Sequence, residues 1–450
     1  MAAVPAGPAR VRQLSPQDWP LWRDLRLRAL ADAPDAFGET LAQAQARSDE
    51  GWSGFAARPD VAQLVAERAG APVGMALAVI DAEDPARANL YAMWVAPEAR
   101  GQGTGGALVD AALAWVRARA VLELSLRVTE GNAAARGLYL ARGFRETGER
   151  ALLRGGGGGA ADAADADAAG PHSCTMTLRR PPLVMGVVNV TPDSFSDGGR
   201  FLDPAAAIDH GLLLAAAGAD LLDVGGEATN PRAAPIDARE ELRRVLPVIE
   251  ALAAAGLTVS VDTTKAEVAR AAVAAGARLV NDVSGGLFDP AMPAALAGLD
   301  ATYIAGHLRG ATLADVFAAE GTVAWADVAR ELAQRLEALP ADARARAWID
   351  PGLGFGKGAD PEGNLDLLRH AGDLRRAVRR PVVVGPSRKR FLRRVVAAAG
   401  AAATAAAADT ATLDAATLGA CLGAVRGGAQ VLRVHNVALL RAALAVYTRL

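Results

Sequence analysis

Polar and charged side chains recur through the second half of the chain, each placed close to the end of a short apolar stretch. They are amides, carboxylates, a hydroxyl and cations, namely Asn189, Glu227, Thr229, Asp262, Asn281, His307, Asp350, Lys389, Arg433 and His435. Gathered in one place, such amides, carboxylates and cations can bind a polar ligand through hydrogen bonds and charge. A lone Asp or Asn in such a place is more often a helix N-cap, but that explanation does not account for Lys389, Arg433 or His435.

A glycine-rich turn in the first half of the chain points to a different chemistry. The segment RGQGTGG (100–106) follows an apolar strand and opens an amphipathic helix. Glycines at a helix start leave the first backbone N–H groups bare, and the helix dipole adds positive potential, so the turn is suited to an anion. The spacing of Gly101, Gly103 and Gly105 does not fit the G-x-G-x-x-G dinucleotide pattern. A plain strand-to-helix turn is the alternative.

The segments that must position the first set of residues alternate between apolar strands and alanine-rich helices. The strands are LVMGVVNV, ADLLDVGG, LTVSVDT, ARLVNDV, ATYIAGH, AWIDPG, PVVVGPS and AQVLRVHNV. About eight such units over roughly 270 residues predict an α/β fold, a (β/α)8 TIM barrel, with a doubly wound open sheet as the runner-up. In a barrel the carboxyl ends of the strands meet at one mouth, so these polar residues should converge there.

The same residues lie in sequence motifs that resemble those of a known family. The motifs are MGVVNVTPDSFSDGG, SVDTTK, NDVSG, DPGLGFGK, GPSRK and RVHNV, in that order. Together they resemble dihydropteroate synthase, a TIM barrel of the folate pathway that is usually dimeric. The resemblance covers the whole second half. It implies condensation of 4-aminobenzoate with 6-hydroxymethyl-7,8-dihydropterin pyrophosphate to give 7,8-dihydropteroate and pyrophosphate, by a homodimer.

The resemblance also implies roles for individual residues. The pterin would be held by Asp262, Asn281, Asp350 and Lys389, and the pyrophosphate by Thr229, Arg433 and His435. Lys389, Arg433 and His435 would act in catalysis, because positive charge favours departure of the diphosphate. Asn189 would ligate Mg²⁺, joined by Asp197 when its loop closes. The aminobenzoate would lie between Phe195 and Phe355, with its carboxylate at Arg390.

The sequence departs from the family pattern at several positions. Asn230 replaces an arginine that contacts pyrophosphate, and Arg232 is the nearest substitute. Gly306 stands where methionine is usual, Asn436 where aspartate is common, and Leu413 about where an arginine is often found. These changes leave a second hypothesis, a pterin-binding paralogue with weak or lost synthase activity. The complete TPDSFSDGG and SRK motifs argue against a third hypothesis, a pterin-dependent methyltransferase barrel.

The first half resembles the GNAT family of acetyl-CoA-dependent N-acetyltransferases, which has an α+β acyltransferase fold. Arg100, Gly103 and Gly105 match the family's pyrophosphate motif, and NAAARGLYLARGF (132–144) matches its second signature. The resemblance implies an acetyl-CoA site made by Val95, Arg100, Gly101, Gly103, Gly105, Gly106 and Asn132, with Tyr139 protonating the departing thiolate. For Tyr139 the alternative is a core tyrosine, and for the whole domain a CoA-binding module without turnover. The acetyl acceptor cannot be identified from these residues.

A low-complexity tract raises the question of where the two halves meet. Residues 155–170 contain only Gly, Ala and Asp, a composition that offers no face to bury. After it, SCTMTLRR alternates as a half-buried strand does, and the GNAT fold needs one more strand after RETGERALLR. We therefore expect a GNAT domain over 9–180, with 155–172 as a disordered hairpin loop, and a synthase barrel over 182–450. A plain interdomain linker is the alternative.

Bulk composition excludes several classes of function. The 450 residues are 52% hydrophobic and carry a net charge of −2, so no broad basic field exists for nucleic acid or an anionic membrane. No signal peptide or membrane-spanning run is evident. The two cysteines, Cys174 and Cys421, are far apart, which is typical of a protein in the reducing cytoplasm.

Overall fold

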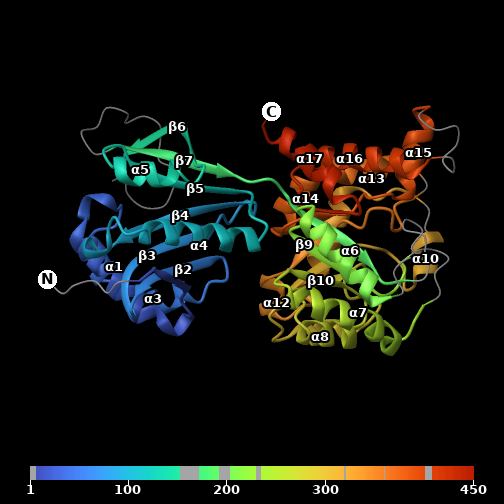
Figure 1. The fold of residues 1–450 in the computed structure, drawn as a ribbon, viewed down its shortest axis with the longest axis horizontal. Coiled ribbons are helices and arrows are strands. Elements are labelled where there is room, and N and C mark those ends of the chain that lie inside the picture. The colour runs from blue at the N-terminus through green and yellow to red at the C-terminus, as the bar shows by residue number, and fades with distance from the viewer. Residues whose placement is uncertain are drawn as a thin grey trace. The chain divides into compact units, whose positions relative to one another are not determined.

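The computed structural model describes residues 7–152, 172–191, 203–229, 235–318, 321–358, 360–400 and 408–449. The chain divides into two compact units, Met1–Arg180 and Pro181–Leu450. No helix in these described ranges is both long enough and apolar enough to cross a bilayer. Figure 1 shows the elements of both units.

The first unit is built on a seven-stranded sheet in the order β1-β2-β3-β4-β5-β7-β6. Neighbouring strands are antiparallel except β4 and β5, which are parallel. The strands are β1 (Arg10–Gln13), β2 (Val61–Arg68), β3 (Ala71–Ile80), β4 (Arg87–Val95), β5 (Glu123–Thr129), β6 (Arg145–Leu152) and β7 (His172–Arg179).

Helices cover both faces of this sheet because its strands alternate two sets of apolar side chains. In β2, Leu64 packs with Leu108 of α4 in one core, and its neighbour Val65 packs with Trp22 of α1 in the other. The helices are α1 (Trp19–Asp32), α2 (Leu41–Gln45), α3 (Asp49–Ala56), α4 (Thr104–Ala118) and α5 (Ala133–Leu140). Short 3₁₀ turns are η1 (Pro16–Asp18), η2 (Pro34–Ala36) and η3 (Pro97–Ala99).

Strand β7 lies inside the first sheet, although the Gly/Ala/Asp tract separates it in sequence from β6. Leu126 of β5 pairs with Met176 of β7, and Met176 in turn pairs with Glu146 of β6. Met176 is fully buried in the core beside α4. One boundary is corrected, since His172, which we expected in the loop, already belongs to β7. Residues 153–171, which contain the tract, lie outside the described ranges.

This position of β7 predicts how fragments of the first unit behave. A fragment of residues 1–180 should fold and bind acetyl-CoA, whereas 1–154 should be insoluble, because β6 would lose its partner and β5 a neighbour. Replacing residues 155–170 by a short turn should be tolerated. Circular dichroism and acetyl-CoA titration of the three proteins check this. A stable, CoA-binding 1–154 fragment would contradict it.

The second unit is a closed parallel barrel, which confirms the predicted TIM barrel and rules out the open-sheet alternative. The eight strands are β8 (Leu183–Asn189), β9 (Leu221–Gly225), β10 (Val259–Asp262), β11 (Leu279–Asp282), β12 (Thr302–Gly306), β13 (Trp348–Asp350), β14 (Val383–Val384) and β15 (Val431–Val434). From β8 to β13 each strand pairs in parallel with the next, β14 pairs with β15, and β15 pairs with β8. A parallel bridge between Ile349 and Val382 closes the ring.

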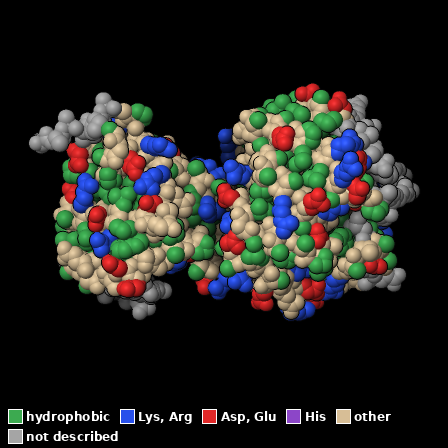
Figure 2. All heavy atoms as spheres, turned by 90° about the horizontal axis from the view of Figure 1, so that it is seen from below, with side chains coloured by type: hydrophobic (Ala, Val, Ile, Leu, Met, Phe, Trp, Pro, Cys, Tyr) green, Lys and Arg blue, Asp and Glu red, His purple; other side chains and the backbone are tan. Residues whose placement is uncertain are grey.

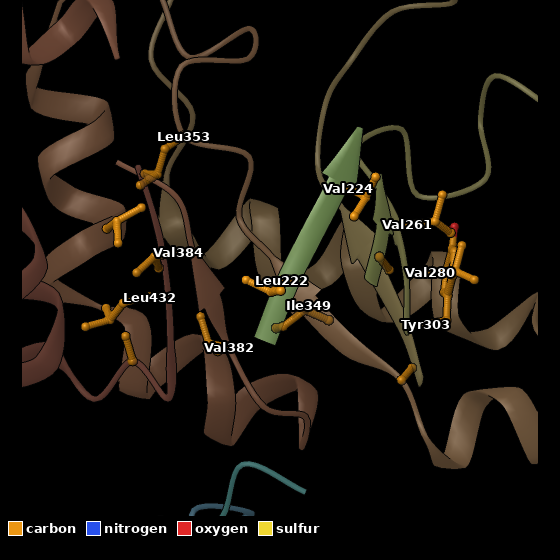
Figure 3. Close-up of a cluster of buried hydrophobic side chains, with 14 of the residues drawn as sticks. Leu222, Val224, Val261, Val280, Tyr303, Ile349, Leu353, Val382, Val384 and Leu432 are labelled. Atoms are coloured by element: carbon orange, nitrogen blue, oxygen red, sulfur yellow. The ribbon is translucent and has the colours of Figure 1, made fainter. Parts of the chain in front are cut away.

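Helices surround the barrel because alternate strand residues are large and apolar. Figure 3 shows this layer, which includes Leu222, Val224, Val261, Val280 and Ile349. The helices are α6 (Pro204–Ala216), α7 (Ala238–Ala254), α8 (Ala266–Ala274), α9 (Met292–Leu296), α10 (Leu313–Ala318), α11 (Trp325–Glu337), α12 (Ala341–Ala345), α13 (Glu362–Arg369), α14 (Ala371–Val378), α15 (Arg390–Ala398), α16 (Thr410–Gly427) and α17 (Val437–Tyr447).

The other strand residues point into the barrel, and several of these are polar. Asp223 alternates with Leu222 and Val224, and Asp262 is in register with Asn281. On the outside, the faces visible in Figure 2 carry positive and negative side chains interspersed rather than a field of one sign.

Candidate functional site

A cavity opens at the carboxyl ends of the barrel strands. It is lined by Thr229, Asp262, Asn281, Val283, Gly306, Asp350, Gly352, Leu353, Phe355, Gly385, Lys389 and Arg433. Seven of these are residues that the sequence singled out, and they come from six different strands or the loops that follow them. The convergence follows from barrel closure, because parallel strands bring their carboxyl ends to one mouth.

Arg433 forms the electrostatic centre of the cavity floor. Its Nε donates to Oδ2 of Asp223 at 2.6 Å, and its Nη2 donates to Oδ2 of Asp262 at 2.7 Å. Burial raises the pKa of Asp262 to about 7. Burial opposes the charge of Arg433 as well, yet Asp223 and Asp262 raise its pKa above the ordinary value. One guanidinium therefore balances a fully buried carboxyl group and a half-buried one.

Asp223 is a site residue that sequence reasoning missed. It is fully buried, and its Oδ2 also accepts a hydrogen bond from Nδ2 of Asn281 at 2.9 Å. The available signal was a carboxylate inside an otherwise apolar strand, ADLLDVGG. A buried charge is rare unless it is paired, so a carboxylate in this strand is a signal of a polar partner inside the barrel.

Another part of the cavity lining combines a cation, an aromatic ring and a carboxyl group. Nζ of Lys389 lies 3.9 Å from the ring centroid of Phe355, within cation–π range. Burial lowers the pKa of Lys389 to about 8. Asp350 accepts a hydrogen bond from the backbone N–H of Gly352 at 2.7 Å, and burial raises its pKa. Hydrogen-bond acceptors and donors thus line the same cavity.

Three described residues that the sequence assigned to a ligand do not line this cavity, and neither do the strand-end residues Glu227 and His307. Nδ1 of His435 lies 2.9 Å from Oγ of Ser387, and burial lowers the pKa of His435 to about 3, so its imidazole is neutral. Arg390 is exposed at the start of α15, with its guanidinium 5.5 Å from the ring centroid of Phe317. Asn189, half-buried, ends β8. Phe195, Asp197, Asn230 and Arg232 lie outside the described residues.

Asn189 is the described residue that the sequence assigned to a magnesium ion. In the part of the chain that the structure describes, no three His, Cys, Asp or Glu side chains gather to hold a metal. Mg²⁺ commonly takes one or two protein oxygens and completes its shell with water and substrate phosphates. A single amide oxygen at the end of β8 fits an ion that arrives with a diphosphate.

Two departures from the expected family pattern have steric reasons. A Cβ atom on Gly306 would lie 2.4 Å from the carbonyl oxygen of Val283, so a side chain does not fit there without a backbone shift. Leu413 is buried against Val396 and Ala408 and packs as an apolar residue rather than facing a ligand.

A third departure, Asn436, belongs to a hydrogen-bond network below the loop that carries Lys389. Its Nδ2 donates to Oδ2 of Asp414 at 2.9 Å, and its Oδ1 accepts from the N–H of Leu439 at the start of α17. Nε of Arg388 donates to Oδ1 of Asp414 at 2.8 Å. Burial opposes the charge, but Arg388 and Asn436 lower the pKa of Asp414. Asparagine fits here because its neighbour is already a carboxylate.

This network predicts a cost for restoring the family's usual residue. Asn436→Asp keeps the N-cap but sets two carboxylates against each other, so the free energy of unfolding should fall by about 1–3 kcal/mol at neutral pH. The loss should shrink in acid, where one carboxyl is protonated. Adding Asp414→Asn, which restores an amide–carboxylate pair, should recover most of it. Urea unfolding of the three proteins measures this, and an Asn436→Asp variant as stable as the parent would contradict it.

Another strand-end residue, Glu227, forms an ion cluster beside the cavity. Nζ of Lys265 donates to Oε2 of Glu227 at 2.5 Å and to Oε2 of the fully buried Glu241 at 2.6 Å. Oε1 of Glu227 accepts from the N–H of Ile236 at 3.1 Å. The cluster thus connects Glu227, after β9, to Ile236 and to the first turn of α7. It does not line the cavity.

In the first unit, the glycine-rich turn has the geometry of an anion site. Gly103 has φ +80° and caps α4, whose first turn receives no side-chain cap. Space is open around Gly101 and Gly103, whereas a Cβ on Gly106 would lie 2.2 Å from Nη2 of Arg142. Bare N–H groups and open space at a helix start are what a pyrophosphate requires.

The side chain of Arg100 does not point at this turn. Its Nε donates to the carbonyl oxygen of Val95 at 3.0 Å, and its guanidinium pairs with Asp32. The turn is held instead by Arg68, whose Nη1 and Nη2 donate to the side-chain and backbone oxygens of Gln102, each at 2.6 Å. Arg68 was not singled out from the sequence, since it lies in an ordinary strand.

Strands β4 and β5 separate above this turn. Their register ends at Leu90 and Leu126, although β4 runs on to Val95 and β5 to Thr129. Asn132 caps α5 by accepting from the N–H of Ala135 at 3.0 Å. Tyr139 is buried near the end of α5, edge-on to Phe144 with centroids 5.7 Å apart, and burial raises its pKa to about 12. Its phenol therefore keeps its proton at neutral pH.

Comparison with known proteins relates both units to described families. A family model described as pterin binding enzyme matches residues 185–435, and one described as the acetyltransferase (GNAT) family matches residues 22–144. Dihydropteroate synthase of Mycobacterium leprae is 44% identical over 263 residues, which cover 57% of this chain and 89% of the relative.

Solved structures give the same relation. The Xanthomonas albilineans dihydropteroate synthase with 4-aminobenzoic acid is 42% identical with a TM-score of 0.51, covering 61% of this chain and 95% of that one. The Burkholderia cenocepacia dihydropteroate synthase complexed with 7,8-dihydropteroate is 35% identical with a TM-score of 0.51, covering 61% and 93%.

Proposed function

Because this chain belongs to the dihydropteroate synthase family of pterin binding enzymes and also carries a GNAT acetyltransferase domain, we propose that its barrel condenses 4-aminobenzoate with 6-hydroxymethyl-7,8-dihydropterin pyrophosphate. The amine nitrogen forms a bond to the methylene carbon, the carbon–oxygen bond to the diphosphate breaks, pyrophosphate leaves, and the nitrogen gives up one proton to water or to the departing pyrophosphate. The observation that carries the proposal is the cavity in which Asp262, Asn281, Asp350 and Lys389 converge.

The cavity residues suit the two ends of the pterin substrate. Asp262, Asp350 and Asn281 offer acceptors and a donor to its amino and amide edge, and Lys389 adds a donor on the ring. Arg433 and Thr229 serve the diphosphate, whereas His435, which is neutral and bound to Ser387, would serve it as a hydrogen-bond donor and not as a cation. Since Arg433 bonds to Asp262 in the free protein, binding of the pterin edge would take over Asp262 and free the guanidinium for the leaving group.

The second substrate needs a flat apolar slot and a cation. Phe355 lies on the cavity wall and Arg390 opens the neighbouring helix, so we place the aminobenzoate ring beside Phe355, opposite Phe195, and its carboxylate at Arg390. A bound Mg²⁺, held by Asn189 with Asp197, would neutralise charge on the diphosphate.

A direct assay tests the proposal. The purified chain with both substrates and Mg²⁺ should release dihydropteroate and pyrophosphate, and omission of Mg²⁺ should abolish turnover. If the chain binds the pterin substrate but forms no product, the barrel is instead a binding paralogue.

For the first unit we propose acetyl transfer from acetyl-CoA to an amine. The uncapped start of α4 would hold the pyrophosphate, with Val95, Gly101, Gly103, Gly105, Gly106 and Asn132 along the cofactor and Tyr139 donating a proton toward the thiolate. Arg100 opens the turn but contacts Val95 and Asp32 in the free protein, so its guanidinium would have to leave Asp32 to reach the pyrophosphate. Calorimetric titration with acetyl-CoA tests the site, and absence of binding would contradict it.

We also propose that the barrel pairs with a second copy of itself. Leu439 and Val446 on α17 are 37% and 61% exposed and lie two turns apart on one face. Apolar side chains of this size at the surface favour association. Sedimentation equilibrium tests the proposal, and a monomer at all concentrations would contradict it.

A further inference from the structure

Lys357 is a buried cation in the barrel that the proposed reaction does not use. It lies in the glycine-rich loop between β13 and α13, and its side chain is 2% exposed. Its Nζ lies 2.9 Å from the carbonyl oxygen of Phe355, 3.2 Å from that of His307 and 2.9 Å from Nδ1 of His307. Burial lowers its pKa to about 7. Below that pH the ammonium has one N–H for each of the three acceptors.

Glu331 determines which nitrogen of His307 carries the hydrogen. Arg309 holds the carboxylate of Glu331, and its hydrogen bond lowers the pKa of Glu331 to about 2. An ionised carboxylate only accepts, so Nε2 of His307, 3.0 Å from Oε2 of Glu331, carries the hydrogen. Burial lowers the pKa of His307 to about 3, so the ring is neutral. Its Nδ1 is then a lone pair aimed at Lys357.

Lys357 thereby connects the end of β12 to the loop that carries Phe355. The loop is tightly fitted, since a Cβ on Gly352 would lie 1.8 Å from the carbonyl oxygen of His307. Oδ1 of Asn364 accepts from the N–H of Gly354 at 2.7 Å on the other side. The ring of Phe355 lines the cavity under Nζ of Lys389. A shift of the Phe355 backbone would therefore move one wall of the cavity.

A buried ammonium held by neutral acceptors is a costly way to stabilise a loop. Replacing buried charged groups by apolar ones of similar size is often neutral or stabilising, and methionine has nearly the length of lysine. The ammonium is directional where methionine is not, since it fixes three acceptors in defined places. Because Lys357 binds the backbone carbonyl of Phe355, and Phe355 lines the cavity, its position points to a role in placing a substrate.

We propose that Lys357 is a positioning residue for 4-aminobenzoate, fixing Phe355 through its carbonyl, with His307 and Glu331 setting the direction of the hydrogen bonds. The inference rests on the proposed synthase function. It predicts a larger effect on the second substrate than on the pterin, because Asp262 and Asn281 lie on other strands and Asp350 is bound by the N–H of Gly352 rather than by Lys357.

The test compares KM values for the two substrates at about pH 6, where Lys357 is charged. Lys357→Met should raise the KM for 4-aminobenzoate about tenfold, in keeping with a displaced wall. The KM for the pterin substrate should change less than about twofold. His307→Gln, which keeps a donor for Glu331 but removes the acceptor for Lys357, should act in the same direction. His307→Asn, which keeps an acceptor near the place of Nδ1, should behave like the parent.

Thermal unfolding of each variant separates positioning from folding. If Lys357→Met does not fold, the two His307 variants decide. Equal rises in both KM values, or no rise in either Lys357→Met or His307→Gln, would overturn the inference. A parent protein that makes no dihydropteroate would instead contradict the proposed function, so the two failures are distinguishable.

Discussion

Asp262→Asn should lower kcat/KM for the pterin substrate by about a hundredfold, which corresponds to ~2.7 kcal/mol of transition-state stabilisation. Asp262 is half-buried at the cavity floor and its Oδ2 is held 2.7 Å from Nη2 of Arg433. An ionised carboxylate there can accept hydrogen bonds from the amino and ring N–H groups of a pterin. Asparagine has almost the same shape, but it presents two N–H donors where the ligand also donates.

The pH profile gives this prediction a second measurement. Because burial raises the pKa of Asp262 to about 7, the carboxyl is protonated below that pH and accepts poorly. In the parent, kcat/KM should therefore rise with pH up to about 7, and Asp262→Asn should lack this acid limb. Initial rates of dihydropteroate formation from pH 5 to 8 measure both quantities.

Asp220 offers a matched control at the opposite end of the barrel. Its Oδ2 accepts from the N–H of Val184 at the start of β8, far along the strands from the mouth. Asp220→Asn should reduce stability without changing kcat/KM. Full activity in Asp262→Asn would overturn its assignment to the pterin.

The sequence was sufficient to predict which strand ends meet, but not how their side chains pair. Asp262, Asn281, Asp350 and Lys389 line one cavity because the apolar spacing predicts a closed parallel barrel, and closure alone brings strand ends together. In contrast, the pairing of Arg433 with Asp223 depends on which of several rotamers packs best. Residues 223 and 433 are 210 positions apart, and no local pattern links them.

Lys357 and Arg68 illustrate the same limit, because their burial could not be predicted from the sequence. A lysine in DPGLGFGK and an arginine at the end of a strand have the sequence pattern of solvent-exposed residues, yet both are buried. Their burial results from loops that fold back over them, so it depends on tertiary packing. Strand β7 was easier to predict for two reasons. Its alternation of apolar and polar residues is visible in the local sequence, and the GNAT fold requires one more strand after β6.

Arg433→Ala should have the largest effect on the barrel, lowering the free energy of unfolding by about 3–5 kcal/mol and abolishing measurable turnover. Removing one member of a buried ion cluster leaves the others uncompensated. Here the remaining groups are Asp223, fully buried, and Asp262. Equilibrium denaturation in urea measures the loss. Arg243→Ala is the control, because its i,i+3 pair with Glu240 is exposed to solvent and its loss should leave the free energy of unfolding almost unchanged.

A second substitution separates the structural role of Arg433 from its role toward the diphosphate. Asp223→Asn in the Arg433→Ala background removes the uncompensated carboxylate and keeps an acceptor for Nδ2 of Asn281. Much of the lost stability should return, whereas affinity for pyrophosphate and turnover should stay low, because the guanidinium that meets the leaving group is still missing. If stability does not return, Asp223 is not the charge that Arg433 balances. If turnover returns with stability, Arg433 acts only in folding, and the diphosphate must be met by Thr229, His435 and Mg²⁺ alone.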